Sequence, residues 1–294
     1  MLWYSQKAAG RMATAKLAAT ARMLGLFFSR QERCAPQKIY DILSTHNNLA
    51  ENSLYLNLGY WENASTYDGA CQALADILGR HAGIGAGDHI LDAGCGFGDQ
   101  DDYWLRRFGP AHVTAINITS SQLSVARARF PDPRLEFTTA DATALPFGQS
   151  SFDKVIALES AFHFEPREAF FGEAMRVLKP GGVLALADIV VARPPQTAFA
   201  RHVAKIGRAL WQTPECNVYG EEVYLAKLKA AGFGEIKITP ITPFVFAPFK
   251  AFAQRRVMDA EIRRRVHPFL RHVWAASHGG FDNMEYLIIT AVKT

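Results

Sequence analysis

Short runs of β-branched and aliphatic residues alternate with longer amphipathic stretches from about residue 89 onward. The short runs predict seven strands, at His89–Ala93, His112–Asn117, Leu135–Thr138, Lys154–Leu158, Val183–Ile189, Glu235–Ile241 and Met284–Val292. The amphipathic stretches predict helices at Tyr103–Phe108, Ser121–Phe130, Arg167–Leu178 and Glu221–Ala231. Because strands and helices alternate, we expect an α/β fold with one doubly wound, mainly parallel sheet of seven strands.

Three segments lie outside this alternation: residues 1–80, about 191–220 and about 243–282. Long structureless loops are uncommon in a compact domain, so we expect helices in all three. We interpret residues 1–80 as an N-terminal helical arm and lid, and residues 81–294 as a ligand-binding core with two cap insertions. Caps above the carboxyl edge of the sheet would enclose a substrate.

The composition is that of a globular protein, with 49% hydrophobic and 20% charged residues among 294. No apolar stretch is long enough to predict a membrane span. Four cysteines (Cys34, Cys71, Cys95 and Cys216) lie far apart and show no metal-ligand spacing. We therefore expect reduced thiols, no metal site and a cytoplasmic protein.

The net charge of +4 is distributed unevenly, and residues 1–36 carry six lysines and arginines against Glu32 alone. Four apolar residues fall roughly on one helical face of this arm, namely Leu17, Leu24, Phe27 and Phe28. Two interpretations stand. The arm is either a lid or oligomer contact, or a basic amphipathic segment for peripheral membrane contact or targeting.

The late insertion has a similar excess of cations, namely Lys250, Arg255, Arg256, Arg263, Arg264, Arg265 and Arg271. They form either a solvated helix face or a grip for an anionic substrate. The same segment is rich in aromatic residues, which suggests a hydrophobic acceptor: Phe244, Phe246, Phe249, Phe252, Phe269, Trp274 and Phe281.

The glycine-rich stretch "ILDAGCGFGDQDD" follows the first predicted strand. A dinucleotide-binding turn needs a third small residue in the pattern G-x-G-x-x-G, but Asp99 stands at that position. The third glycine comes one residue earlier, which gives D-x-G-x-G-x-G from Asp92. Alternating glycines let backbone amides approach a carboxylate near a helix N-terminus, and a carboxylate at Asp92 suits an ammonium group.

Three further blocks follow in order: "ADATALPF", "SFDKVIALES" and "RVLKPGGVLALAD". With the glycine-rich stretch they resemble the motifs of class I S-adenosylmethionine-dependent methyltransferases, which have a Rossmann-like fold. The resemblance is to the small-molecule type, which includes the rebeccamycin sugar O-methyltransferase and the ubiquinone- and menaquinone-type C-methyltransferases.

This resemblance implies S-adenosylmethionine as the cofactor, with contacts that can be carried over by position. Asp92, Gly94, Gly96 and Gly98 are expected at the methionine end. The remaining predicted cofactor residues are Asn117, Ile118 and Gln122 near the ribose, Asp141 and Ala142 near the adenine, and Leu158, Tyr55, Tyr60 and Trp61 in the walls. A turn cap is the alternative for Asp141, and aromatic packing is the alternative for the tyrosines and the tryptophan.

The candidate base is His163, which follows the fourth predicted strand in "ALESAFHF". Histidine suits this task because its ordinary pKa is near neutral pH. The resemblance places an aspartate at the end of the next strand, so we expect Asp188 to orient the His163 imidazole. Glu159 is expected to contact the cofactor or the acceptor. The alternatives are a packed histidine at 163 and a helix cap at 159.

We therefore expect methyl transfer to a small hydrophobic metabolite, with an oxygen acceptor as first choice. The alternatives are C- or N-methylation of an isoprenoid, quinone or amine, and a non-catalytic cofactor-binding or lipid-associated protein. A nucleic-acid partner is not expected. Base methyltransferases of this superfamily carry Asn/Asp-Pro-Pro-aromatic where this chain has Leu158-Glu159-Ser160-Ala161.

Overall fold

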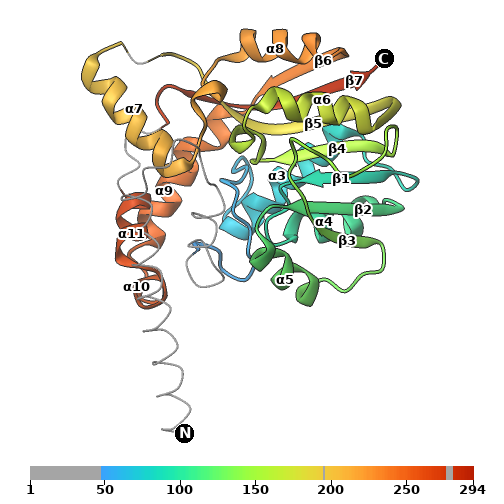
Figure 1. Ribbon diagram of the computed structural model, residues 1–294. Coiled ribbons are helices and arrows are strands. Elements are labelled where there is room, and N and C mark those ends of the chain that lie inside the picture. Colours follow the sequence, from blue (N-terminus) through green and yellow to red (C-terminus); the bar gives the residue numbers. More distant parts are fainter. Residues whose placement is uncertain (1–47, 195, 276–280) are drawn as a thin grey trace, which may run out of the picture.

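A seven-stranded sheet forms the centre of the computed structural model, which describes residues 48–194, 196–275 and 281–294 (Figure 1). The strand order is β3-β2-β1-β4-β5-β7-β6, and only β7 runs antiparallel to its neighbours. The strands are β1 (His89–Ala93), β2 (His112–Asn117), β3 (Leu135–Thr139), β4 (Phe152–Leu158), β5 (Leu178–Val191), β6 (Phe233–Pro240) and β7 (Met284–Lys293). The predicted mainly parallel, seven-stranded α/β fold is confirmed.

Helices cover both faces of the sheet, and each face has its own apolar core. The helices α3 (Tyr67–Ala82), α4 (Asp99–Phe108) and α5 (Ser120–Arg129) pack on one face, and α6 (Arg167–Val177) and α8 (Glu221–Ala230) on the other. There is a core on each face because successive side chains of a strand point to opposite faces: in β1, Ile90 belongs to the first core and Leu91 to the second. A strand that is buried on both faces reads as a continuous apolar run.

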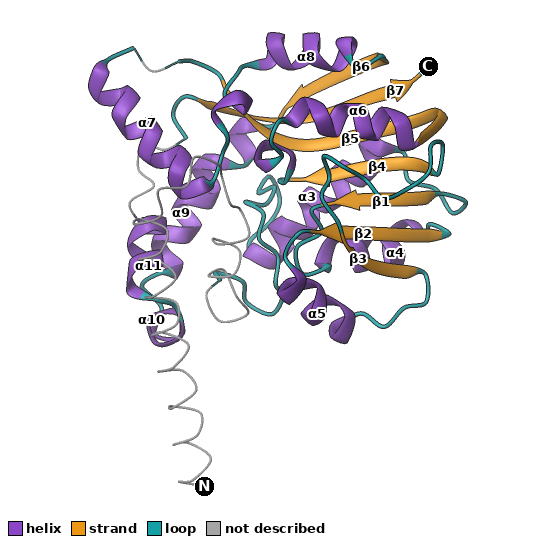
Figure 2. Cartoon of the chain, in the orientation of Figure 1, coloured by secondary structure: helices purple, strands orange, loops and turns teal. Residues whose placement is uncertain are grey.

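Further helices lie beyond the carboxyl ends of β1, β4 and β5, on the left of Figure 2. The segment after β5 forms α7 (Ala198–Trp211) and the short helix η2 (Glu215–Asn217). The segment before β7 forms η3 (Thr242–Phe244), α9 (Phe246–Arg256), α10 (Ala260–Arg265) and α11 (Pro268–Ala275). Both predicted cap insertions thus contain helices, whereas the basic arm predicted at 1–36 lies outside the described residues. No helix in the described ranges is long and apolar enough to cross a membrane.

Candidate active site

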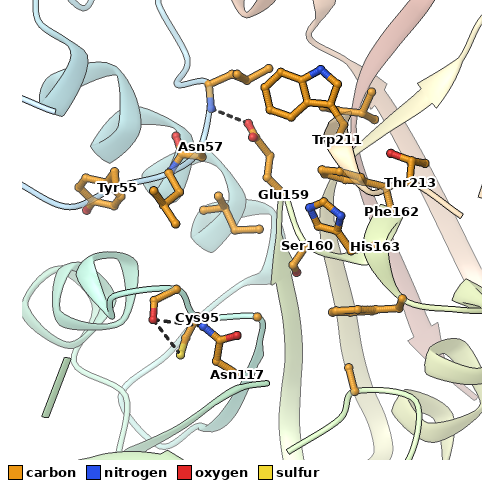
Figure 3. A pocket seen from close by; sticks show the side chains of 18 of the residues that line it. Tyr55, Asn57, Cys95, Asn117, Glu159, Ser160, Phe162, His163, Trp211 and Thr213 are labelled. Atoms are coloured by element: carbon orange, nitrogen blue, oxygen red, sulfur yellow. Dashed lines mark hydrogen bonds between the residues drawn. The ribbon is translucent and has the colours of Figure 1, made fainter. Parts of the chain in front are cut away.

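A cavity of about 380 Å³ opens at the carboxyl ends of β1, β2, β4 and β5. In a doubly wound sheet this edge is the usual place for a ligand. One half of the cavity is lined by the glycine loop and the ends of the first strands, and the other half by residues that follow β4 and by the caps (Figure 3). The predicted site residues that line it are Tyr55, Gly94, Gly96, Asn117, Ile118, Gln122, Asp141, Ala142, Leu158, Glu159 and His163.

Asp92 is not among the lining residues, because its side chain is completely buried behind the glycine loop. Its Oδ2 accepts a hydrogen bond from Nε2 of Gln100 at 3.0 Å. Asp101 of α4 is also fully buried beside it, and the described structure holds no hydrogen-bond donor for either oxygen of Asp101. Burial and repulsion by Asp92 raise the pKa of Asp101, and burial also raises the pKa of Asp92 to about 7, so we expect at least one of the two carboxyl groups to keep its proton near neutral pH.

Gly98 does not line the cavity either, and it serves the packing of α4 instead. Its φ of 83° is left-handed, and a Cβ there would come within 2.7 Å of the Phe137 ring on β3. A side chain at 98 would therefore push the helix away from the sheet. The third glycine of the motif shapes the loop from below, while Gly94 and Gly96 face the cavity.

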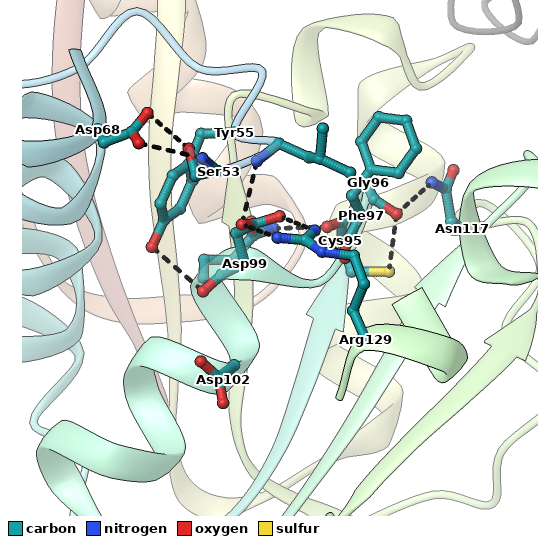
Figure 4. Close-up of polar contacts among 12 residues, drawn as sticks. Ser53, Tyr55, Asp68, Cys95, Gly96, Phe97, Asp99, Asp102, Asn117 and Arg129 are labelled. Atoms are coloured by element: carbon teal, nitrogen blue, oxygen red, sulfur yellow. Dashed lines mark hydrogen bonds and ion pairs between the residues drawn. The ribbon is translucent and has the colours of Figure 1, made fainter. Parts of the chain in front are cut away.

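Asp99 joins three parts of the chain at the start of α4 (Figure 4). Its two carboxylate oxygens pair with both terminal nitrogens of Arg129, at 2.6 and 2.7 Å. It also accepts the amide of Leu54 at 3.1 Å, and its carbonyl accepts from the Tyr55 hydroxyl at 3.1 Å. The acidic stretch after the glycines thus attaches the segment before α3 to the glycine loop.

The predicted ribose and adenine residues are held by bonds among themselves. Nδ2 of Asn117 donates to Oε1 of Gln122 at 2.8 Å and to the carbonyl of Gly96 at 3.4 Å. Oδ1 of Asp141 accepts from the amide and the hydroxyl of Thr143, both at 2.8 Å. Asp141 therefore caps a turn and also lines the cavity, which leaves its Oδ2 outside the cap.

The strap, residues 51–58, covers the cavity with the consecutive lining residues 54–58. Tyr60 and Trp61 come after the strap and do not line the cavity. Nε1 of Trp61 donates to the carbonyl of Leu58 at 2.8 Å. The centroid of the Trp61 ring lies 5.1 Å from the centroid of the Phe252 ring. The Tyr60 hydroxyl donates to Glu62. These two aromatic residues support the strap from behind rather than forming a cavity wall.

His163 lies in the short helix η1 (Ala161–His163) and is 8% exposed, at the cavity surface. Its Nδ1 lies 3.2 Å from the carbonyl oxygen of Gln212, which follows α7. A carbonyl only accepts, so Nδ1 carries the proton and the lone pair is on Nε2. Burial, reinforced by the nearby Arg167 cation, lowers the pKa of His163 to about 4, although the carbonyl acts in the opposite direction.

The predicted pair between His163 and Asp188 does not form. Asp188 is completely buried, and its carboxylate accepts from the Tyr224 hydroxyl at 2.8 Å and faces Nε of Arg167 at 3.3 Å. Arg167 is also fully buried and lies between two tyrosine rings. A carboxylate at the end of β5 therefore neutralises a buried arginine, and a backbone carbonyl orients the histidine.

Comparisons with known proteins agree with this geometry. A family model for a methyltransferase domain matches residues 91–186. The chain is 35% identical to erythromycin 3''-O-methyltransferase of Saccharopolyspora erythraea over 240 residues. The aligned region covers 77% of each of the two chains. The chain belongs to the class I S-adenosylmethionine-dependent methyltransferases. It is also 31% identical over 248 residues to O-methyltransferase resE of Aspergillus sclerotiorum, covering 81% of this methyltransferase and 89% of that protein.

Solved structures show the same fold as this methyltransferase. The [4+2]-cyclase SpnF superposes with a TM-score of 0.69 at 26% identity, over 89% of this chain and 97% of that one. The cyclopropane synthase MmaA2 of Mycobacterium tuberculosis superposes with a TM-score of 0.74 at 19% identity, over 86% and 95% of the two chains. Members of this fold therefore carry different chemistries, so the acceptor chemistry must be argued from the site.

The methyl donor of the enzyme is S-adenosylmethionine, and the chemistry of the cavity fits it. Asn117 and Asp141 bring hydrogen-bonding groups suited to ribose hydroxyls and an exocyclic amine, and Glu159 brings a carboxylate suited to a cation. When bound, the donor supplies an electrophilic methyl group on a sulfonium. The chain itself contributes the alignment, the exclusion of water and a group that takes up a proton.

The half of the methyltransferase cavity away from the glycine loop is mainly aromatic, and we call it the acceptor half. Phe162, Trp211, Phe249, Trp274 and Phe281 line it, so part of the aromatic cluster in the late insertion contacts the cavity. None of the seven cations of that insertion is a lining residue in the described structure. Instead, Arg256 pairs with Asp259 and Glu261, and the other cations lie outside the cavity. The grip for an anionic substrate is therefore not built from them.

Sequence reasoning missed Asn217, a buried residue of η2. Its Nδ2 donates to the carbonyls of Phe162 and Phe164 at 3.0 and 2.6 Å, and its Oδ1 accepts from the amide of Arg167 at 3.0 Å. These bonds hold the backbone that carries His163. The only sequence signal was a polar residue in a hydrophobic cap, which is common at surfaces and therefore uninformative.

Proposed function

We propose that this methyltransferase methylates a hydroxyl group of a small, largely apolar metabolite, with His163 as the general base. The observation that carries the proposal is the contact between Nδ1 of His163 and the Gln212 carbonyl, which puts the lone pair of the neutral imidazole on Nε2. The aromatic lining of the acceptor half supports an apolar substrate. Relatives named for O-methylation of erythromycin and demethylrifamycin support an oxygen acceptor in a natural product.

In this proposal the chain performs two tasks. The caps and the strap hold the acceptor in line with the methyl group and exclude water. Nε2 of His163 takes the hydroxyl proton as the oxygen forms its bond to carbon. The imidazole is neutral at physiological pH because its pKa is lowered to about 4, so it is ready to accept that proton.

An acceptor screen, monitored by the release of S-adenosylhomocysteine, tests the proposal. We expect turnover with hydroxyl-bearing polyketides or glycosides, and a decrease of about 10²- to 10⁴-fold in kcat for H163A, the usual contribution of a general base. The donor Kd of H163A should stay within about threefold, because donor binding rests mainly on the other half of the cavity.

The matched control for this experiment is H112A, which removes a partly exposed histidine that faces Glu136 on the sheet. It should retain wild-type kcat. Full turnover of a hydroxyl acceptor by H163A would contradict the role of His163. Turnover confined to amines or carbon acids would replace the oxygen acceptor by the corresponding alternative.

A further inference from the structure

Glu159 lies where the two halves of the cavity meet. It is the first residue after β4, and Figure 3 shows its side chain between the cofactor residues around Asn117 and the acceptor residues around Phe162 and Trp211. Its φ of 50° is left-handed, which is unusual and strained for a residue with a side chain. The transferred methyl group has to cross this junction, so Glu159 faces the place where the reaction occurs.

The surroundings of Glu159 hold it in place but do not neutralise it. Oε1 accepts from the Leu58 amide at 2.8 Å and from the Tyr286 hydroxyl at 2.7 Å, and neither bond uses Oε2. The titratable groups that act on it are Tyr286 of β7, Asp188 of β5, and Tyr67 and Cys71 of α3. None of these groups is a cation.

The Glu159 side chain is only partly exposed, and a carboxylate so withdrawn from water is costly to ionise without a cation beside it. Desolvation accordingly raises the pKa of Glu159 to about 7, and the charge of Asp188 acts in the same direction, while the hydrogen bonds from Leu58 and Tyr286 act against it. A positive charge brought into the cavity by a ligand would offset the cost of ionising Glu159. Arg208 is the one cationic side chain among the described lining residues, and its guanidinium faces Glu215 of η2 at 3.8 Å.

We propose that the Glu159 carboxylate is the counter-charge of the sulfonium in the methyl donor, and that it makes the enzyme bind the donor more tightly than the demethylated product. S-adenosylhomocysteine has the same adenosine, carboxylate and ammonium groups, but its sulfur is neutral. Only a charge placed near the sulfur can distinguish the two ligands electrostatically. Glu159 is a carboxylate at the junction where that sulfur has to lie. This inference rests on the established donor and not on the identity of the acceptor.

The proposal has a pH dependence with a definite sign. The attraction requires ionised Glu159, so the preference for the donor should grow as the pH rises through about 7 and fade below it. Below that pH, donor binding must displace the Glu159 proton into the buffer. Product binding gains no such attraction and should release less proton at this site.

Isothermal titration calorimetry without acceptor tests the proposal on the intact protein, with S-adenosylmethionine and S-adenosylhomocysteine as the two ligands. For the wild type we expect the ratio of product Kd to donor Kd to rise about tenfold or more between pH 5.5 and 8.5. Titrations in buffers of different ionisation enthalpy should show proton release on donor binding at pH 6. In E159Q, which keeps an oxygen for Leu58 and Tyr286, the ratio should be low and independent of pH.

Two further variants make the experiment decisive. E136Q removes an exposed carboxylate of β3 that lies outside the cavity and should behave as the wild type. Y286F removes one donor to Oε1, which should raise the pKa of Glu159 and move the pH transition of the ratio upward. A constant ratio in the wild type would overturn the proposal. So would equal weakening of both ligands in E159Q, which would make Glu159 only a support of the strap.

The test of Glu159 by ligand binding and the test of His163 by turnover give independent results. An acceptor role for Glu159 as a base would lower kcat in E159Q while the ligand ratio stayed as in the wild type, and this too would overturn the proposal. Failure of H163A to lose activity would concern the acceptor chemistry and would leave the ligand ratio untouched.

Discussion

At the scale of single residues, the proposed base His163 has a neutral partner. A carboxylate beside His163 would raise its pKa, as in the expected pair with Asp188, whereas the Gln212 carbonyl fixes the tautomer without adding a full charge. The Arg167 cation nearby lowers the pKa further. In the proposed mechanism His163 is thus a weak base that stays neutral down to about pH 4, instead of a stronger base that is half protonated near neutral pH.

This arrangement predicts the acid limb of the pH profile. At saturating donor, kcat/KM for a hydroxyl acceptor should not fall around pH 6.5, where an ordinary histidine protonates, but only as the pH approaches about 4. The sign follows from the lowered pKa, since the neutral form survives to lower pH. Initial rates between pH 4.5 and 8 provide the measurement. A limb centred near 6.5 would show that His163 is solvated or paired with a carboxylate during turnover.

A second residue-scale feature is the buried pair of Asp92 and Asp101 below the glycine loop. Folding raises the pKa of Asp101, so the native state retains a carboxyl proton that the unfolded chain loses above about pH 4. Stability from this proton is fully present below the unfolded pKa and decreases as the pH rises toward the folded pKa.

D101N should remove this pH dependence, because an amide donates to Asp92 at every pH. The free energy of unfolding of the wild type should decline relative to D101N by roughly 1 kcal/mol per pH unit between pH 5 and 7, the slope for one proton. Urea unfolding at several pH values measures it. Parallel curves for the two proteins would mean that the pair holds no proton.

At the scale of elements, three carboxylates from different parts of the sequence hold the strap. Asp68 of α3 accepts the amides of residues 51, 52 and 53 at 3.2, 2.8 and 3.0 Å. Asp99 accepts the amide of Leu54, and Glu159 that of Leu58. Bonds from amides to charged acceptors are stronger than neutral ones, so Asp68 and Asp99 fix the start and the middle of the strap, and Glu159 adds a bond at its end that strengthens when Glu159 ionises.

D68N should therefore loosen the start of the strap and weaken donor binding. We expect the Kd for S-adenosylmethionine to rise about fivefold to tenfold, since charged hydrogen bonds contribute about 1.5–3 kcal/mol and an amide keeps part of this. Amide exchange at residues 51–53 should accelerate. The control is D132N, in which the carboxylate belongs to an exposed pair with Arg134. Faster exchange with an unchanged Kd would show that this part of the strap does not contribute to donor binding.

At the scale of the whole molecule, the buried pair of Arg167 and Asp188 joins the sheet to one helical layer. Arg167 comes from α6, Asp188 from β5, and Tyr224 of α8 donates to the carboxylate. The side chains of Arg167 and Asp188 are both 0% exposed. Removing one member of such a pair leaves an unpaired charge in a place without water, which is far more costly than losing an exposed pair.

D188A should lower the free energy of unfolding by about 3–5 kcal/mol, measured by urea denaturation. D102A breaks the exposed pair with Arg106 and should cost at most about 1 kcal/mol. The double variant R167M/D188L should recover most of the stability, because apolar groups of similar volume replace both charges. A small loss in D188A would show that the arginine finds another partner or becomes solvated.

The sequence predicted the strands well because alternating burial on a two-sided sheet leaves a clear pattern. β1 and β2 have the predicted bounds, and the fold is as expected. Helix α4 begins at Asp99 and not at Tyr103, because the buried polar residues in its first turn have partners that no local pattern reveals.

The candidate site follows the same rule. Gly94, Asn117, Asp141 and His163 could be located because each follows a strand of a parallel sheet, where side chains meet. The role expected of Asp188 and the place expected of Asp92 could not be judged, because burial by other elements decided both. The carbonyl of Gln212 lies 49 residues from His163 and is a backbone group, so its amino-acid type carries no signal.

The backbone of Gln212 has a further consequence for exchanging acceptor pockets between relatives. Its φ of 50° directs a carbonyl from the end of the α7 segment onto the imidazole of His163. Any recombination that imports a foreign α7 segment through this residue also imports the group that sets the tautomer. If the foreign segment ends before residue 212, the chain keeps its own Gln212 carbonyl beside His163. If the foreign segment extends past residue 212, the incoming residue at that position has to adopt the same left-handed backbone conformation.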